Sequence, residues 1–170
     1  EPGDTVLDLG CGPGVNFGML REAVGREGWV LAVDLSPGML QRARSRVDDR
    51  DWENVGLVRA DATLPNARDG RLDGAVATTA VSATPDVRST VENVYDALRS
   101  GTRFALYEIR LVPSGIARAL NPLVRSFYRH FGNWNADEDV LRELGRVFDR
   151  TEVVETFALG TNYVVVAEKW

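Results

Sequence analysis

The chain has 170 residues, 44% of them hydrophobic, and a formal net charge of −5 at pH 7. This length and apolar content suit a single domain, 1–170, and no window approaches the ~18–20 apolar residues of a membrane span, so stable membrane insertion is not expected. The net negative charge argues against a protein that binds nucleic-acid phosphates through a basic face, so no nucleic-acid partner is expected.

Strand-like apolar runs alternate with segments of helical period over the first two thirds of the sequence. Strands are predicted at 5–9, 29–34, 55–60, 73–78 and 102–109, and helices at 16–24, 37–47 and 87–98. Ser36 and Pro37 supply an N-cap and a preset first turn for the second helix. The alternation predicts an α/β protein with a Rossmann-like, doubly wound and mostly parallel sheet.

The last third of the sequence departs from this alternation. Residues 113–134 form a helical, aromatic-rich insert, for which a substrate lid at 110–135 is predicted, and 136–147 has the pattern of an amphipathic helix. Two strands are predicted at 152–157 and 163–168. The short turn between them makes them antiparallel neighbours. We therefore expect one antiparallel strand near the C-terminal end of an otherwise parallel sheet.

A glycine-rich turn follows the first predicted strand. Residues 6–14 read V-L-D-L-G-C-G-P-G, which places Asp8 ahead of Gly10, Gly12 and Gly14. Glycine permits positive φ and lets a ligand approach the backbone, and the helix that follows offers unpaired N–H groups. A tight turn that binds nothing is the simpler interpretation. A dinucleotide site would favour G-x-G-x-x-G, but position 15 is valine.

Acidic residues also follow the next two strands. Asp34 ends the second strand, where its carboxylate can accept hydrogen bonds from both hydroxyls of a ribose, or instead cap the following helix. Asp61 and Ala62 follow the third strand, and Thr79 follows the fourth. These segments fall at one edge of a parallel sheet, which is where open α/β folds bind ligands.

Together these motifs resemble those of the class I S-adenosylmethionine-dependent methyltransferases. The likeness is to the small, metal-independent type, similar to the enzymes that methylate ubiquinone or menaquinone precursors and other small molecules. The resemblance implies S-adenosyl-L-methionine as the cofactor, with Asp8 and the Gly10 carbonyl near its ammonium group, Asp34 on its ribose and Asp61 on its adenine amino group. The cofactor-binding residues that it implies are Asp8, Gly10, Cys11, Gly12, Gly14, Asp34, Leu35, Met39, Asp61, Ala62 and Thr79.

The sequence departs from that family's pattern in two places. Many members carry a histidine or an aromatic residue after the fourth strand, whereas this chain has V-S-A-T at 81–84, so no base is supplied there. The chain also begins almost at the first strand, without the N-terminal helix or helices that usually cover the cofactor. We therefore expect part of the acceptor pocket to lie outside this sequence.

The insert is expected to select a small-molecule or lipid-like acceptor, although apolar residues at helical spacing more often form core. Tyr107 and Glu108, at the end of the fifth strand, are expected to face the cofactor edge. Glu108 is the candidate for orienting or deprotonating the acceptor, with a salt bridge to an arginine as the alternative. No metal is expected, because there is one histidine and no cluster with metal-ligand spacing. The predicted substrate-side residues are Tyr107, Phe127, His130 and Trp134.

The sequence therefore predicts an S-adenosylmethionine-dependent methyltransferase. A non-catalytic module that binds the same cofactor, or a partner subunit, is one alternative, and a nicotinamide-dependent dehydrogenase is a weaker one because of the glycine spacing. The single cysteine, Cys11, cannot form an internal disulfide, so a cytoplasmic location is expected. The acceptor atom and the oligomeric state are left open.

Overall fold

A seven-stranded sheet forms the centre of the computed structural model, which describes residues 1–64, 70–131, 134 and 138–170, without the side chains of 129–131. The strands are β1 (Thr5–Leu9), β2 (Trp29–Asp34), β3 (Val55–Arg59), β4 (Gly74–Thr78), β5 (Thr102–Ile109), β6 (Arg150–Phe157) and β7 (Asn162–Lys169). Their order is β3-β2-β1-β4-β5-β7-β6. The first five are parallel, and β7 is antiparallel to both of its neighbours. The predicted fold class is confirmed.

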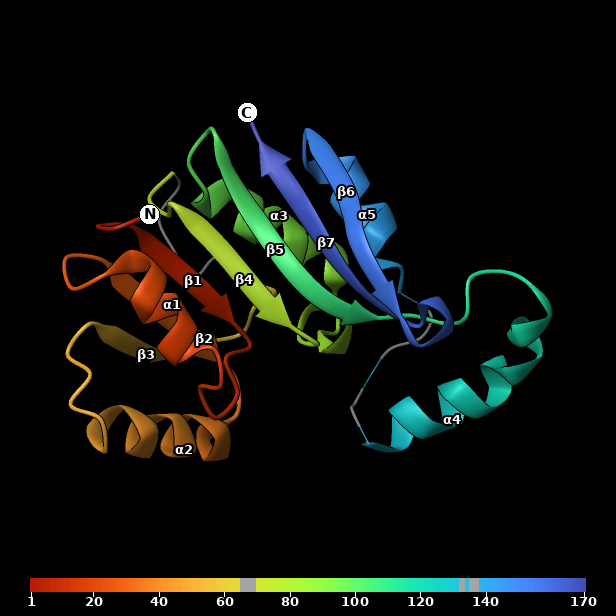
Figure 1. The fold of residues 1–170 in the computed structure, drawn as a ribbon, viewed down its shortest axis with the longest axis horizontal. Coiled ribbons are helices and arrows are strands. Elements are labelled where there is room, and N and C mark those ends of the chain that lie inside the picture. The colour runs from red at the N-terminus through yellow and green to blue at the C-terminus, as the bar shows by residue number, and fades with distance from the viewer. Residues whose placement is uncertain (65–69, 132–133, 135–137) are drawn as a thin grey trace.

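Helices cover both faces of this sheet (Figure 1). The helices are α1 (Phe17–Val24), α2 (Pro37–Asp48), α3 (Val87–Ala97), α4 (Asn121–Phe131) and α5 (Val140–Val147), with short 3₁₀ segments η1 (Val81–Ala83), η2 (Ile116–Leu120) and η3 (Ala158–Gly160). The helix predicted at 136–147 begins later, because Asp139 accepts a hydrogen bond from the Arg142 N–H and caps it. Residues 136–137 lie outside the described residues.

Two apolar clusters hold the layers together, one on each face of the sheet. On the first face, Phe17 of α1 and Val47 of α2 pack with Val30 of β2. On the second, Val91 of α3 and Leu144 of α5 belong to a cluster with residues of β1, β4, β5 and β7. Because these strands are covered on both faces, their sequences are apolar runs rather than alternating patterns.

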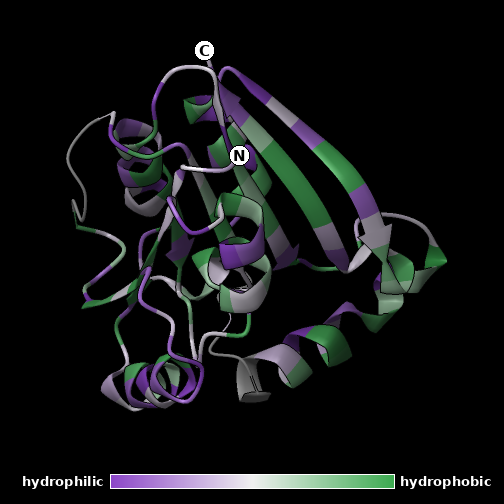
Figure 2. Cartoon of the chain, turned by 60° about the vertical axis from the view of Figure 1, so that its left-hand side comes forward, coloured by the Kyte–Doolittle hydropathy of each residue, from purple (hydrophilic) through white to green (hydrophobic). Residues whose placement is uncertain are grey.

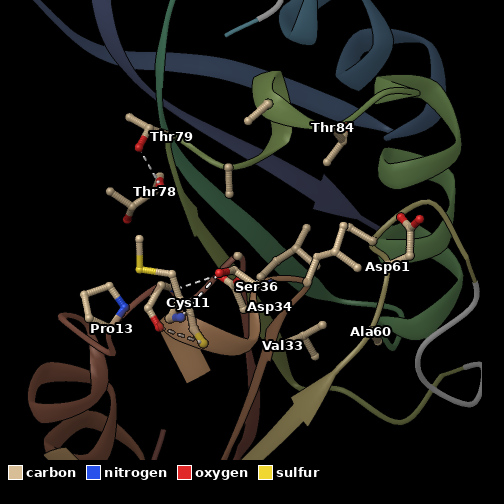
Figure 3. Close-up of a pocket in the computed structure, with 18 of the residues that line it drawn as sticks. Cys11, Pro13, Val33, Asp34, Ser36, Ala60, Asp61, Thr78, Thr79 and Thr84 are labelled. Atoms are coloured by element: carbon tan, nitrogen blue, oxygen red, sulfur yellow. Dashed lines mark hydrogen bonds between the residues drawn. The ribbon is translucent and has the colours of Figure 1, made fainter. Parts of the chain in front are cut away.

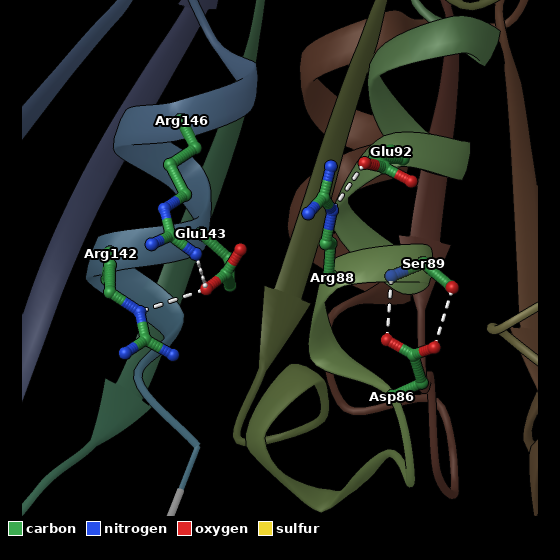
Figure 4. Close-up of polar contacts among 7 residues, drawn as sticks. All are labelled: Asp86, Arg88, Ser89, Glu92, Arg142, Glu143 and Arg146. Atoms are coloured by element: carbon green, nitrogen blue, oxygen red, sulfur yellow. Dashed lines mark hydrogen bonds and ion pairs between the residues drawn. The ribbon is translucent and has the colours of Figure 1, made fainter.

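Polar contacts fix the two helices of the second face (Figure 4). Asp86 accepts a hydrogen bond of 2.9 Å from the Ser89 N–H and caps α3. Glu143 of α5 is almost fully buried and accepts hydrogen bonds of 3.0 Å from Arg142 and 2.9 Å from Arg146. The cap at Asp86 fixes the start of α3 and therefore the end of the loop that connects β4 to it.

The connections after β1 and β4 leave neighbouring strands toward opposite faces of the sheet. This is a topological switch point, and in open α/β sheets the crevice at the carboxyl ends of such strands is the usual place for a ligand. At the same edge, α4 stands apart from the sheet (Figure 1). No helix in the described part of the chain is long and apolar enough to cross a membrane.

Candidate cofactor site and acceptor cavity

A cavity of about 630 Å³ opens at the carboxyl ends of the first four strands (Figure 3). Its walls come from the loop after each strand: 10–13 after β1, 34–36 after β2, 60–62 after β3 and 78–80 after β4, with 83–85 beyond them. Segments far apart in the sequence therefore meet at the switch point. The cavity lies at the edge of the sheet that the sequence predicted for the ligand.

The three glycines of the β1 turn have different surroundings, although all three have positive φ. A Cβ at Gly10 would lie 2.3 Å from the Cβ of Ala80, and one at Gly14 would lie 2.3 Å from the Phe17 ring. A Cβ at Gly12 would meet nothing within 4 Å. Gly10 and Gly14 therefore permit close packing, whereas the bare backbone of Gly12 faces the open cavity. Gly14 was predicted to bind the cofactor, but it is not among the residues that line the cavity.

Asp34 joins the loop after β1 to the loop after β2. One carboxylate oxygen accepts a hydrogen bond of 2.8 Å from the Gly12 N–H, and the other accepts one of 2.8 Å from the Ser36 N–H. A carboxylate has about four acceptor positions, so each oxygen can accept a further bond from a molecule in the cavity. The cap of α2 comes from the Ser36 hydroxyl and not from Asp34.

Asp8 lies behind the glycine turn and is fully buried. Its Oδ1 accepts a hydrogen bond of 3.0 Å from the amide of Asn16, which also donates to the Thr78 hydroxyl at 3.3 Å. Its Oδ2 is buried without a partner among the described residues. Burial raises the pKa of Asp8 to about 6, against the opposing effect of the hydrogen bond from Asn16. Asn16 lines the cavity, and Asp8 reaches it only through this amide.

The opposite wall is less polar. Leu35 and Met39 both line the cavity and present exposed apolar side chains to it. Asp61 lies beside Ala62 at the far end, where its Oδ1 accepts hydrogen bonds from the backbone N–H and the hydroxyl of Thr63. These bonds lower the pKa of Asp61, so its carboxylate is ionised at neutral pH.

Thr79 separates this cavity from a second one. Its φ of 51° is in the left-handed region, which is uncommon for a residue with a branched side chain, and its N–H donates to the Tyr107 carbonyl at 2.7 Å. Backbone strain of this kind occurs often at functional sites. Thr79 lines both cavities, so the two cavities adjoin at this residue.

The second cavity, of about 290 Å³, lies between the ends of β5 and β7 and the helix α4. The Tyr107 hydroxyl donates to the Asn162 side-chain oxygen at 2.9 Å, and the Asn162 amide donates to the Tyr128 hydroxyl at 3.4 Å. Phe127 and the buried Trp134 supply apolar surface. The cavity is lined by Thr79, Ser82, Tyr107, Ile109, Phe127, Tyr128, Trp134 and Asn162.

The structure corrects the expected placement of Glu108. Its side chain is fully buried on the other side of β5 and lines neither cavity. It accepts hydrogen bonds from the N–H groups of Val81 and Ser82 at 2.8 and 3.3 Å and from the Ser82 hydroxyl at 2.5 Å. Consecutive strand residues point to opposite faces, so Tyr107 and Glu108 cannot both face one site. Glu108 instead holds η1, and the alternative of a salt bridge to an arginine is also not observed.

Of the predicted cofactor residues, all except Asp8 and Gly14 line the first cavity. Tyr107, Phe127 and Trp134 come together in the second, whereas the side chain of His130 lies outside the described residues. Asn16 lines the first cavity and Asn162 the second, although the sequence predicted neither as a site residue. Asn16 follows the glycine turn directly and could have been noticed as a polar residue at a helix start, but Asn162 has no comparable local signal.

Within the described residues, no three side chains of histidine, cysteine, aspartate or glutamate come together as a metal site. Cys11 is buried, and burial together with the nearby carboxylates raises its thiol pKa to about 12, so the thiol is unreactive at neutral pH.

Comparison with known proteins gives a consistent result. A family model described as a methyltransferase domain matches residues 6–101. The chain is 32% identical over 108 residues to arsenite methyltransferase of Halobacterium salinarum (64% of this chain, 28% of that protein) and 33% identical over 103 residues to aklanonic acid methyltransferase of a Streptomyces species (61% and 47%). It is 26% identical over 175 residues to 2-phytyl-1,4-naphthoquinone methyltransferase of Synechococcus elongatus (98% and 70%). The chain thus spans less than half the length of the first two of these relatives.

Solved structures share the fold. An S-adenosylmethionine-dependent methyltransferase from Aquifex aeolicus has a TM-score of 0.70 at 18% identity, over 98% of this chain and 81% of that one. Geranyl diphosphate C-methyltransferase from Streptomyces coelicolor has a TM-score of 0.76 at 16% identity, over 98% and 74%. At these identities the likeness establishes the architecture alone.

Proposed function

The chain belongs to the methyltransferase-domain family, and from that membership we propose that it transfers a methyl group from S-adenosylmethionine to a small-molecule acceptor. One observation carries the proposal: the cavity at the switch point has the bare backbone of Gly12 on one side and the carboxylate of Asp34 beside it. This combination leaves room for a nucleoside against the backbone and offers an acceptor for its hydroxyl groups.

The residues present fit the proposed cofactor. Asp34 accepts the ribose hydroxyls with its remaining lone pairs, because its backbone bonds use only part of its capacity. Leu35 and Met39 supply the apolar surface for the adenine, and Asp61, next to Ala62, accepts its amino group. The segment of Gly10, Cys11 and Gly12 forms the floor, since all three line the cavity.

The methionine end of the cofactor belongs at the Asp8 side of this floor. The Oδ2 atom of Asp8 is buried without a partner among the described residues, and we infer that the cofactor's ammonium group supplies the positive charge that a buried carboxylate requires. Asn16 lines the cavity and donates to that carboxylate, and we propose that Asn16 and the Gly10 carbonyl orient the ammonium group or accept hydrogen bonds from it, directly or through water. Gly14 supports the turn through Phe17 and makes no contact of this kind.

The proposed chemistry depends mainly on alignment. The bound cofactor supplies an electrophilic methyl group, so the chain's own residues need only orient the acceptor and exclude water. The cavity beyond Thr79 is proposed to hold the acceptor. There the Tyr107 oxygen keeps acceptor capacity after donating to Asn162, and Phe127 and Trp134 enclose a ring. The predicted lid, 110–135, is proposed to act through its described residues Phe127, Tyr128 and Trp134, which line this cavity, and His130 stays a predicted contact.

Relatives support a small acceptor. The names of those reported above include an arsenite, an aklanonic acid and a 2-phytyl-1,4-naphthoquinone methyltransferase. The net charge of −5 favours such an acceptor over nucleic acid. The cytoplasmic location remains a prediction.

Two measurements test the proposal. Isothermal titration with S-adenosylmethionine and with S-adenosylhomocysteine should show binding of both, and a tritiated-methyl transfer screen against a fractionated extract of the native cell should show a labelled small molecule. Failure of both nucleosides to bind overturns the proposal. Binding with no transfer to any fraction favours the non-catalytic module, and binding of NAD in their place favours the dehydrogenase.

A further inference from the structure

A third cavity, of about 300 Å³, adjoins the acceptor cavity along α4. Phe127 and Tyr128 line both, just as Thr79 lines both the acceptor cavity and the cofactor cavity. The three hollows therefore lie in a row of neighbours with shared walls, from the switch point to the space between α4 and η3. The third is lined by Val112, Leu120, Leu123, Val124, Phe127, Tyr128, Ala158, Leu159 and Thr161.

The walls of this third cavity, here called the α4 groove, are almost entirely apolar. The hydroxyl of Thr161 is already engaged, because it donates to the Ala158 carbonyl at 2.7 Å and accepts from the Asn162 amide at 3.0 Å. The Tyr128 hydroxyl accepts from Asn162, toward the acceptor cavity. The groove therefore suits a hydrocarbon and not a polar group, whereas the acceptor cavity beside it carries the hydrogen-bonding groups.

Large apolar side chains around the groove are left in contact with water. Leu123 is 72% exposed, Leu159 is 67% exposed and Phe127 is 57% exposed. Figure 2 shows hydrophobic segments along α4. Ala158 and Leu159 have positive φ, a strained conformation for residues with a Cβ, and this backbone presents Leu159 to the groove. Exposed apolar surface of this kind often marks a binding groove for an apolar ligand or partner.

We propose that the α4 groove holds an aliphatic chain of the methyl acceptor, so that the substrate class is an amphiphile with a polar ring or head and an apolar tail. The head occupies the cavity of Tyr107 and Asn162, beside Thr79, and the tail runs over the edge-to-face pair of Phe127 and Tyr128 into the groove. The wall that the groove shares with the acceptor cavity favours a chain of the acceptor itself over a second protein or a membrane, because a molecule whose head fills the acceptor cavity reaches the groove directly. This inference rests on the proposed function.

The test uses hydroquinones with alkyl chains of two, six and ten carbons, below the concentration at which they form micelles. Their affinity is measured by isothermal titration at saturating S-adenosylhomocysteine. Each four added carbons should tighten binding at least about tenfold, since even half-burial of four methylenes in this open groove gives that gain and full burial gives about 200-fold. In Leu123→Asp, which changes an exposed wall residue, the gain should disappear while the two-carbon compound binds as before. Ile116→Asp is the matched control, because Ile116 is 96% exposed on the neighbouring η2 and does not line the groove.

Three results overturn the inference: no binding of any member of the series, equal affinity along the series, or a chain-length gain that survives in Leu123→Asp. A vesicle assay tests the membrane alternative. If Leu123→Asp reduces the fraction of protein that sediments with phosphatidylcholine vesicles but leaves the affinity for the hydroquinones unchanged, the apolar surface binds a membrane and the inference is also wrong. Binding of S-adenosylhomocysteine is measured first, in a separate titration of the same protein. If S-adenosylhomocysteine binds but hydroquinone affinity does not depend on chain length, only the tail site is refuted. If S-adenosylhomocysteine does not bind, the proposed function is refuted.

Discussion

The carboxylate of Asp34 accepts the N–H of Gly12 at 2.8 Å, and this bond joins the ends of β1 and β2 across the floor of the cavity. The same carboxylate is proposed to bind the ribose, so a single side chain both shapes the floor and contacts the ligand. Its two tasks can be separated, because one acts in the free protein and the other only when the cofactor is bound.

Replacement of Asp34 by alanine should weaken binding of S-adenosylmethionine by about 1–3 kcal/mol, since charge-assisted hydrogen bonds to the ribose are lost. Isothermal titration measures this loss, and circular dichroism shows whether the variant is folded. Glu22→Ala is the control, because Glu22 is an exposed acid on α1. A folded Asp34→Ala protein with unchanged affinity would show that the ribose lies elsewhere.

Gly12 and Gly10 should respond differently to alanine. At Gly12 the new methyl group enters the open cavity, so cofactor affinity should fall at least about tenfold while stability drops by about 1–2 kcal/mol, the cost of a left-handed alanine. At Gly10 the methyl group meets Ala80 at 2.3 Å, and the fold itself should be destabilised more. Urea denaturation and titration with S-adenosylhomocysteine give the two quantities. Equal effects of the two substitutions on affinity and on stability would show that Gly12 and Gly10 do not have the separate roles assigned to them, in the cavity floor and in packing against Ala80.

Cofactor affinity should depend on the ionisation of Asp8. Burial raises the pKa of Asp8 to about 6, so the carboxyl group is protonated below that pH and ionised above it. Only the ionised form attracts an ammonium group, and affinity for S-adenosylmethionine should therefore rise between pH 5 and 7. Asp8→Asn should remove this rise, and Asp48→Asn, at an exposed position on α2, should keep it. If Asp8→Asn keeps the wild-type pH profile of affinity, the Asp8 carboxylate is not the group that attracts the cofactor's ammonium group.

The same ionisation has the opposite effect on the stability of the free protein. The folded-state pKa of about 6 lies above the ordinary value of 3.8, so the contribution of Asp8 to stability is complete below pH 3.8 and is lost as the pH rises through 6. Asp8→Asn should therefore stabilise the cofactor-free protein by about 3 kcal/mol at pH 8 and by less than about 1 kcal/mol at pH 4. Thermal unfolding at the two pH values measures this difference, and a variant that is less stable at pH 8 would contradict it.

Glu108→Gln should act on stability. A glutamine side chain has one acceptor oxygen in place of two and brings an N–H₂ group toward donors, so the free energy of unfolding should fall by about 2 kcal/mol. Urea denaturation measures this change, with the exposed Glu155→Gln on β6 as the control. If Glu108 served as a catalytic base, methyl transfer would fall sharply with no change in stability, and that result would restore the role that the buried position argues against.

The order of strands and helices was readable from the sequence, because it depends on local patterns. Apolar runs and helical periods gave nearly all the elements, and the short turn before Asn162 indicated an antiparallel pair. The position of β7 between β5 and β6 was not predictable, because strand order depends on which edges are free when the sheet assembles.

The sequence by itself determined the glycine turn, the acid at Asp34 and hence the expected cofactor edge, since these follow from backbone freedom and from the register of strand ends. Only the tertiary structure decided that Gly12 faces open space while Gly14 packs against the Phe17 ring. It also decided that Glu108 is buried on the face of β5 opposite to Tyr107. The reason is physical: a residue's conformation is set mainly by its neighbours in the chain, whereas its burial and contacts are set by distant elements that pack against it.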